Sequence, residues 1–320
     1  MPLTFDMPRE QLVEYEGTNP RPDDMDQFWE ERLRQLEKID PQVEIEEANF
    51  QTDFAHCQHL FFRGMDEAKI HAKLLRPRES SSPHPGIVKF HGYSGDSGDW
   101  SEKLPYVAQG YSVAALDCRG QGGLSEDRGG VRGNTLHGHI IRGLEGPPED
   151  MLFVKIFLDT VRLVRILMDM EEIDGTRIGV TGGSQGGGLT LACAALEPRV
   201  KLVAPLFPFL CDYKRVWDID LAQDAYLELK EYFRKFDPRH EKEREIFAQL
   251  GYIDVQHLCP RIEGRVSMAV GLMDEICPPS TQYAAYNKIE SEKSLTVYPD
   301  FGHENLPGHS DIVFQFMEDL

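Results

Sequence analysis

The sequence lacks the features that mark exported, membrane-spanning and phosphate-binding proteins. Residues 1–17 show no basic start followed by an apolar run, so we expect no secretory signal. No uninterrupted apolar stretch reaches the roughly 18 residues that a transmembrane helix needs. No G-x-G-x-x-G occurs, and the glycines of 182–188 are not followed by the Lys-Ser/Thr of a P-loop. These absences predict a cytoplasmic protein without a membrane span or an organic cofactor.

Basic residues are also scarce. The chain has 34 Lys and Arg against 54 Asp and Glu, a formal net charge of −20. Like charges repel, so we expect neither nucleic acid nor an anionic membrane as a partner. The six cysteines form no C-x-x-C pair, which predicts free thiols in a reducing compartment. A zinc H-E-x-x-H is excluded at His303 because residue 307 is proline, and we expect no metal.

Composition and patterning favour a single α/β domain over residues 1–320, since a hydrophobic fraction of 41% can build a sizeable core. Residues 1–40 are predicted to be a helical lead-in, and residues 211–258 a charged helical insertion. Short apolar strands are expected within 43–75 and at 86–92, 111–120, 176–183, 200–208, 265–274 and 294–300, and helices around 101–109, 151–172, 187–197, 279–290 and 310–319. This alternation predicts a mostly parallel, doubly wound sheet with helices on both faces.

The most informative segment is 177–196, in which Gly182-Gly183-Ser184-Gln185-Gly186 fits G-x-S-x-G. An apolar strand runs into the motif and an apolar helix follows, which is the context that a nucleophile elbow requires. The sharp turn exposes the serine Oγ, and the glycines permit a strained backbone and close approach of neighbouring chain. A glycine-rich turn at the start of a helix is the alternative. The flanking strand and helix favour Ser184 as a nucleophile.

The base that activates such a serine is a histidine, and it follows both serine and acid along the chain in proteins with this elbow. Four histidines come after Ser184, and only His303 directly follows a predicted strand. His240 and His257 lie in or beside the charged insertion and fit a solvated surface. His309 fits the start of the last helix. We therefore expect His303 to be the base.

The acid must orient that histidine and stabilise its charged form. Asp274 ends the strand 265–274 and precedes a turn that opens another helix. A helix-capping or loop aspartate is the structural alternative, and Glu275 and Asp300 are rivals for the role. Asp300 is the less natural choice because it lies close to His303 in sequence. Asp274 is therefore the expected acid.

An oxyanion needs two hydrogen-bond donors. One is expected to be the backbone N–H of Gln185, which follows the nucleophile. The other should come from the loop after an early strand, where the backbone N–H of Tyr93 is the candidate. Gly92 lets that loop pass close to a substrate. The alternative for Tyr93 is a side chain that simply packs over the sheet.

Five motifs point to one family. They are RGQGG (119–123), GGSQGGG (182–188), PFLCDY (208–213), ICPPSTQYAAYN (276–287) and YPDFGHE (298–304). Together, and in this order over nearly the whole chain, they resemble the acetyl xylan esterase and cephalosporin C deacetylase family, which has the α/β-hydrolase fold. The helical lead-in and the insertion are similar too.

The resemblance implies a serine esterase that removes acetyl groups from small substrates, such as acetylated xylo-oligosaccharides and cephalosporin C, through an acetyl-enzyme. It implies a triad of Ser184, Asp274 and His303, and oxyanion donors at Tyr93 and Gln185. It further implies an intracellular homohexamer. The segment 119–123 is expected to support the site from behind the sheet, and the part that Trp100 plays near an acyl pocket stays open.

Two other functions remain to be weighed. Peptidases and acyl-aminoacyl hydrolases share the elbow, but they usually carry a large propeller domain, for which this chain is too short. A non-catalytic binding protein of the same fold typically loses a member of the triad, whereas all three positions are filled here.

Overall fold

The computed structural model describes residues 5–80, 83–128 and 135–320. In these residues the strands form one nine-stranded sheet in the order β1-β2-β3-β5-β4-β6-β7-β8-β9. Their bounds are β1 Glu44–Glu47, β2 Ala55–Arg63, β3 Lys69–Pro77, β4 His84–Phe90, β5 Ser112–Leu116, β6 Ile173–Gly183, β7 Leu202–Leu206, β8 Arg265–Gly271 and β9 Lys293–Tyr298. Every expected strand is present, with shifts at the ends.

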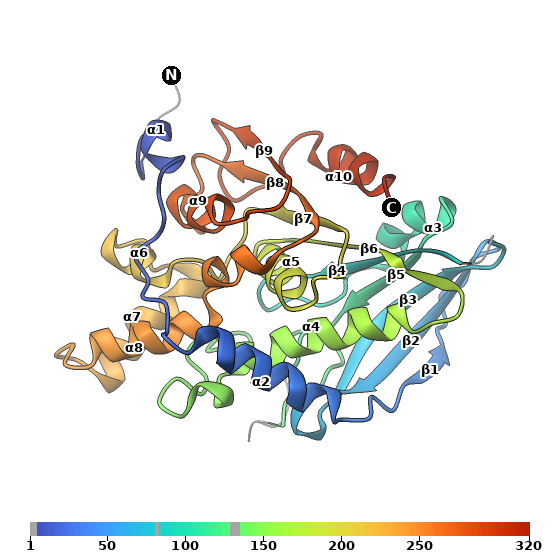
Figure 1. The fold of residues 1–320 in the computed structure, drawn as a ribbon, viewed down its shortest axis with the longest axis horizontal. Coiled ribbons are helices and arrows are strands. Elements are labelled where there is room, and N and C mark those ends of the chain that lie inside the picture. Colours follow the sequence, from blue (N-terminus) through green and yellow to red (C-terminus); the bar gives the residue numbers. More distant parts are fainter. Residues whose placement is uncertain (1–4, 81–82, 129–134) are drawn as a thin grey trace.

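The sheet has two parts. The strands from β5 to β9 pair in parallel, whereas β1, β2 and β3 pair antiparallel and β3 joins β5 antiparallel. The parallel part needs a crossover between neighbours, and helices supply these crossovers. The prediction of a mostly parallel sheet is confirmed, and β1–β3 form an antiparallel extension at one end of the molecule (Figure 1).

Helices cover both faces of the sheet. Their bounds are α1 Arg9–Leu12, α2 Met25–Glu37, α3 Leu104–Ala108, α4 Leu152–Met168, α5 Gln185–Leu196, α6 Tyr213–Asp218, α7 Leu227–Phe236, α8 Glu243–Leu250, α9 Pro279–Asn287 and α10 His309–Met317. Successive side chains of a strand point to opposite faces. Accordingly Val88 of β4 packs in one core cluster with α4 and α5, and its neighbour Ile87 packs in another with α3 and α10.

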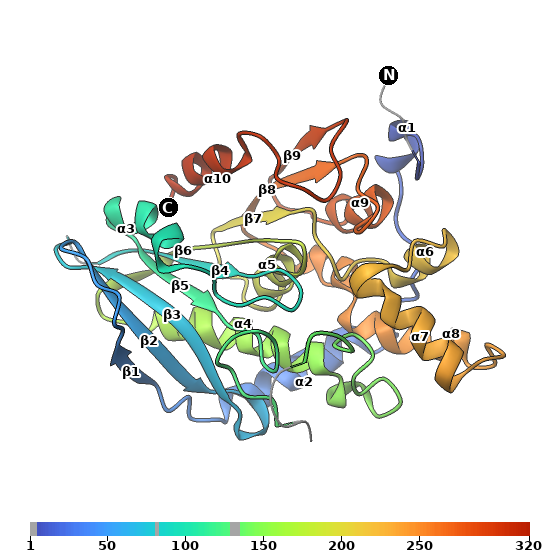
Figure 2. The same ribbon diagram turned by 180° about the vertical axis from the view of Figure 1, so that it is seen from behind.

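The N-terminal lead-in and the insertion 211–258 lie outside the sheet and the helices that cover its two faces. Helix α2 packs on α4, and α1 reaches α9. Helices α6, α7 and α8 form a layer at the opposite end of the molecule from β1–β3, which is visible from both sides (Figures 1 and 2). The insertion is therefore placed beside the carboxyl ends of the parallel strands, next to the residues of the candidate site.

The predictions about the cysteines and about membrane-spanning helices can also be compared with the structure. All six cysteines are free and buried. None of the helices in the described part of the chain has both the length and the apolar character needed to span a bilayer. Helix α4, the longest helix in the described part of the chain, is packed in the core with its polar residues partly or fully buried.

Candidate active site

Ser184 lies in the turn between β6 and α5 with φ 58° and ψ −120°. A positive φ is uncommon for a residue with a side chain, and such strain costs about 1–3 kcal/mol. The turn is held by two hydrogen bonds of 3.0 Å. The Ser184 N–H donates to the Leu206 carbonyl oxygen at the end of β7, and the Phe209 N–H donates to the Ser184 carbonyl oxygen. The strained geometry is that of a nucleophile elbow.

The glycines of the elbow are needed because the backbone passes too close for a Cβ. A Cβ on Gly182 would lie 2.5 Å from the Phe90 carbonyl oxygen, and one on Gly186 would lie 2.2 Å from the same atom. On the other side, a Cβ on Gly187 would lie 2.6 Å from the Leu206 carbonyl oxygen. The start of α5 is thus wedged between the ends of β4 and β7, which fixes where Ser184 sits.

The expected acid and base are brought together. His303 donates from Nδ1 to the Asp274 Oδ2 at 2.8 Å. Asp274 is fully buried. Its Oδ1 accepts the N–H groups of Ile276 at 3.0 Å and Cys277 at 2.8 Å, and Gln282 donates to Oδ2 at 3.3 Å. These bonds orient the carboxylate and assign the proton of the histidine to Nδ1, which leaves Nε2 free to accept one.

A buried cysteine connects this pair to the serine. The Ser184 side chain lies close enough to the Cys277 thiol to lower its pKa, although burial has the larger, opposite effect. Its sulfur, a carboxylate oxygen of Asp274 and a ring nitrogen of His303 all lie within 4.8 Å of one another. Burial, followed by the charge of Asp274, raises the pKa of Cys277 well above its usual value, so the thiol is neutral. Sequence reasoning did not single out this residue.

The same three side chains are potential zinc ligands, because Asp, Cys and His are the donors that zinc prefers. They are the one such group of three in the described part of the chain. The hydrogen bond between Asp274 and His303 explains why two of them are close. Phe207 packs against His303 with 4.3 Å between ring centroids and narrows the space beside it.

The two expected oxyanion donors have free backbone N–H groups. In the described part of the chain neither Gln185 N–H nor Tyr93 N–H is paired with an acceptor. The Tyr93 side chain packs between rings, 4.8 Å from His139 and 5.7 Å from Phe209. The ring of Tyr93 therefore packs against its neighbours, as the structural alternative expected. The backbone N–H stays available as the expected oxyanion donor.

The buried side-chain amide of Gln121 links the loops that carry the two donors, and the sequence did not reveal this contact. The side-chain amides of Gln121 and Gln185 donate to each other at 3.0 Å. Both residues are fully buried. The Gln121 Oε1 also accepts the backbone N–H of Ser94 at 2.9 Å, directly after Tyr93. Gln121 belongs to the 119–123 motif, so this motif contacts the site directly.

The loop that carries Tyr93 is also fixed by a histidine. His91 accepts the Cys118 N–H at Nε2 at 3.0 Å, and its Nδ1 donates to the Gly92 carbonyl oxygen at 2.7 Å. Burial lowers the pKa of His91. Its neutral form is the one that can both donate and accept in this way.

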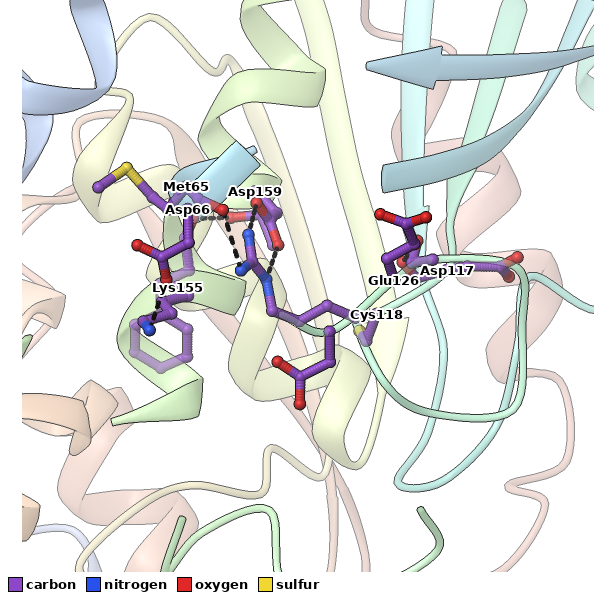
Figure 3. A network of polar contacts seen from close by, with 12 residues as sticks. Met65, Asp66, Asp117, Cys118, Glu126, Lys155 and Asp159 are labelled. Carbon is purple, nitrogen blue, oxygen red and sulfur yellow. Dashed lines mark hydrogen bonds and ion pairs between the residues drawn. The ribbon is translucent and has the colours of Figure 1, made fainter. Parts of the chain in front are cut away.

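Arg119 is the first residue of the 119–123 motif, whose supporting role behind the sheet stays a prediction. It forms a fully buried bidentate ion pair with Asp159 of α4, with two bonds of 2.7 Å. Burial alone would lower the pKa of Arg119, but Asp159 raises it, so the guanidinium stays charged. The guanidinium also donates to the Met65 carbonyl oxygen at 3.3 Å. Figure 3 shows Met65 and Asp159 close together, with the Lys155–Asp66 ion pair beside them. The pair ties the end of β5 to α4.

The other candidates lie elsewhere. Glu275 and Asp300 are exposed, His240 is exposed in the insertion and His309 begins α10. His257 corrects a prediction: it is 6% exposed rather than solvated. The 3-10 turns after α8 pack into the core, so a position beside a charged insertion does not mean a solvated environment. Trp100 stacks on Phe50.

A parallel sheet with helices on both faces, carrying its serine on a strained strand-to-helix turn, defines an α/β-hydrolase. Comparison with known proteins specifies the family. The sequence model of the family described as acetyl xylan esterase (AXE1) matches residues 1–320. The chain belongs to this family of carboxylic ester hydrolases.

Solved structures and a curated relative agree with this assignment. Acetyl xylan esterase 1 from Thermoanaerobacterium sp. JW/SL YS485 is 57% identical with a TM-score of 0.96, covering 98% of this chain and 99% of that one. The acetyl xylan esterase from Paenibacillus sp. R4 is 35% identical with a TM-score of 0.92 and the same coverage. Acetyl esterase Axe7A from Xylanibacter ruminicola is 26% identical over 289 residues. That match covers 87% of this chain and 62% of Axe7A, so the chain spans less than two thirds of that relative.

Proposed function

We propose that this chain is a serine esterase that removes acetyl groups from small acetylated substrates, acetylated xylo-oligosaccharides and cephalosporin C among them. The observation that carries the proposal is the 2.8 Å bond between His303 and Asp274 beside a serine on a strained elbow. Membership of the acetyl xylan esterase family supports the acetyl specificity.

The proposed reaction uses these residues in the following roles. His303 accepts the Ser184 hydroxyl proton at Nε2 while Oγ attacks the acetyl carbonyl carbon. The oxyanion that forms accepts the N–H groups of Tyr93 and Gln185. Asp274 stabilises the imidazolium. The proton then passes to the leaving oxygen, the alcohol departs, and water attacks the acetyl-enzyme with His303 again as base, releasing acetate and restoring Ser184.

We also propose that the site prefers a short acyl group. Cys277 is fully buried against Ser184, and Phe207 packs on His303. A series of p-nitrophenyl esters of increasing chain length measures this preference. We expect the highest kcat/KM at two carbons; a maximum at eight or more carbons would contradict acetyl specificity.

The decisive variant is Ser184→Ala. We expect it to lose p-nitrophenyl acetate turnover and labelling by a fluorophosphonate while its circular dichroism spectrum stays unchanged. Retained turnover would refute the proposed nucleophile. Assays on acetylated xylo-oligosaccharides, cephalosporin C and an amide substrate then separate a deacetylase from a peptidase.

The assembly and the compartment remain predictions from the family resemblance. We propose a cytoplasmic homohexamer; the six free thiols are consistent with a reducing compartment. A mass measurement in solution tests the hexamer, and a monomer would contradict it.

A further inference from the structure

The helical insertion contains a buried carboxylate, Glu228, that contacts a segment next to the candidate site. Glu228, in the first turn of α7, is 2% exposed. Its Oε1 accepts the N–H groups of Gly138 at 2.9 Å and His139 at 3.2 Å. Its Oε2 accepts those of Ile140 at 2.8 Å and Ile141 at 3.3 Å. One side chain thus binds four consecutive backbone N–H groups.

The segment 138–141 that Glu228 holds is in contact with Tyr93. The His139 N–H that bonds Glu228 also donates to the Tyr93 hydroxyl at 3.3 Å, and the two rings lie 4.8 Å apart. A second bond joins the same two loops, because the Ser94 hydroxyl donates to the Leu136 carbonyl oxygen. The side chain of Tyr93 is therefore held against segment 138–141. The backbone N–H of the same residue is the proposed oxyanion donor.

Loss of the hydrogen bonds that Glu228 accepts would destabilise segment 138–141. A buried N–H without an acceptor is destabilising. Four N–H groups bond this carboxylate, and the Tyr93 hydroxyl shares one of them, the His139 N–H. Burial raises the pKa of Glu228 to about 7, although the four N–H groups lower it. An apolar side chain at this position would avoid the desolvation cost but would leave the N–H groups of 138–141 without the carboxylate, so the carboxylate is what holds this segment.

We propose that Glu228 is a positioning residue for acyl transfer, which holds 138–141 against Tyr93 and so keeps the Tyr93 N–H aimed at the oxyanion. The inference rests on the esterase function proposed above. It assigns a role to the insertion, whose helix α7 would complete the oxyanion hole from outside the sheet.

The test compares Glu228→Gln with Asp237→Asn. Asp237 also lies in the insertion, is 6% exposed and accepts two backbone N–H groups, from Glu241 at 2.9 Å and Lys242 at 2.8 Å. Both substitutions replace one carboxylate oxygen by an amide that faces N–H donors. They differ in that the partners of Asp237 lie within the insertion, so this variant measures loss of stability alone.

Two measurements separate positioning from folding. The first is kcat and KM for p-nitrophenyl acetate. The second is Ki for methylboronic acid, whose boron bonds the Ser184 oxygen and presents a negative tetrahedral centre to the oxyanion hole. Loss of one oxyanion donor costs about 100–1,000-fold, so a displaced donor should cost less. We expect Glu228→Gln to lower kcat/KM and raise Ki by a similar factor of about 10–100, with both values for Asp237→Asn within about threefold of the wild type.

Wild-type kinetics and Ki in Glu228→Gln would overturn the proposal, as would equal losses in both variants. If Glu228→Gln fails to fold, Tyr93→Phe tests the same contact from the other side. It should lower kcat/KM and raise Ki together, and unchanged values would overturn the proposal. An inactive wild-type protein would instead refute the esterase function itself, which distinguishes the two failures.

Discussion

Replacing Gly186 with alanine would place a methyl group at the closest backbone contact of the nucleophile elbow. The new Cβ would lie 2.2 Å from the carbonyl oxygen and 2.8 Å from the carbonyl carbon of Phe90. The first distance is at least 1.2 Å shorter than ordinary van der Waals contact, which begins at 3.4 Å, and both atoms belong to the backbone of a central strand. Overpacking costs about 1–3 kcal/mol. We expect a loss near the upper end of this range in urea unfolding, because backbone cannot rotate away.

The same displacement should also slow catalysis. Either α5 or the chain after Phe90 must move by about 1 Å, and these two segments carry the Gln185 and Tyr93 N–H groups. A misplacement of that size can cost about 100-fold in rate. We therefore expect kcat/KM for p-nitrophenyl acetate to fall by about 100-fold.

Gly183→Ala is the matched control, since it makes the same chemical change one residue before Ser184. The nearest atom to its Cβ would be Phe207 Cε2 at 3.4 Å, an ordinary contact. We expect its stability to stay within about 1 kcal/mol of the wild type. Equal stability and equal kcat/KM in Gly183→Ala and Gly186→Ala would refute the close-approach explanation of the elbow.

Two further predictions concern buried ionisable groups. Arg119→Met leaves the Asp159 carboxylate buried without its partner and should cost about 3–5 kcal/mol in urea unfolding. Adding Asp159→Leu should recover most of that loss, and a double variant as unstable as the single one would contradict this. Burial lowers the pKa of His139 from 6.5 to about 4, so the fold holds its neutral form and stability should fall as the pH drops from 6.5 towards 4. His139→Gln should remove up to about 3 kcal/mol of that fall between pH 7 and pH 4, and identical pH profiles would refute the assignment.

Local patterns were enough to predict most of the fold. The expected strands and helices are present because an apolar strand or an amphipathic helix is recognisable within a window of a few residues. Their alternation indicated a mostly parallel sheet, since continuous apolar strands must be covered on both faces. The antiparallel pairing of β1–β3 was not specified, because pairing partners depend on which strand lies alongside.

The same division applies to the candidate site. The elbow around Ser184 is a local signal, and the order of acid and histidine along the chain was sufficient to select Asp274 and His303, which one hydrogen bond joins. Their catalytic roles stay predictions. The burial of His257 was missed because composition describes a segment, whereas burial depends on what packs against it.

The sequence by itself therefore determined the strand and helix pattern, the serine at its turn and the family. Only the tertiary structure decided that Gln121 pairs with Gln185, that Cys277 lies beside Ser184, and that the insertion reaches Tyr93 through 138–141. These contacts join residues far apart in the chain. Each exists because the crossovers of the parallel sheet bring the ends of several strands to one edge, and no local pattern records which side chains meet there.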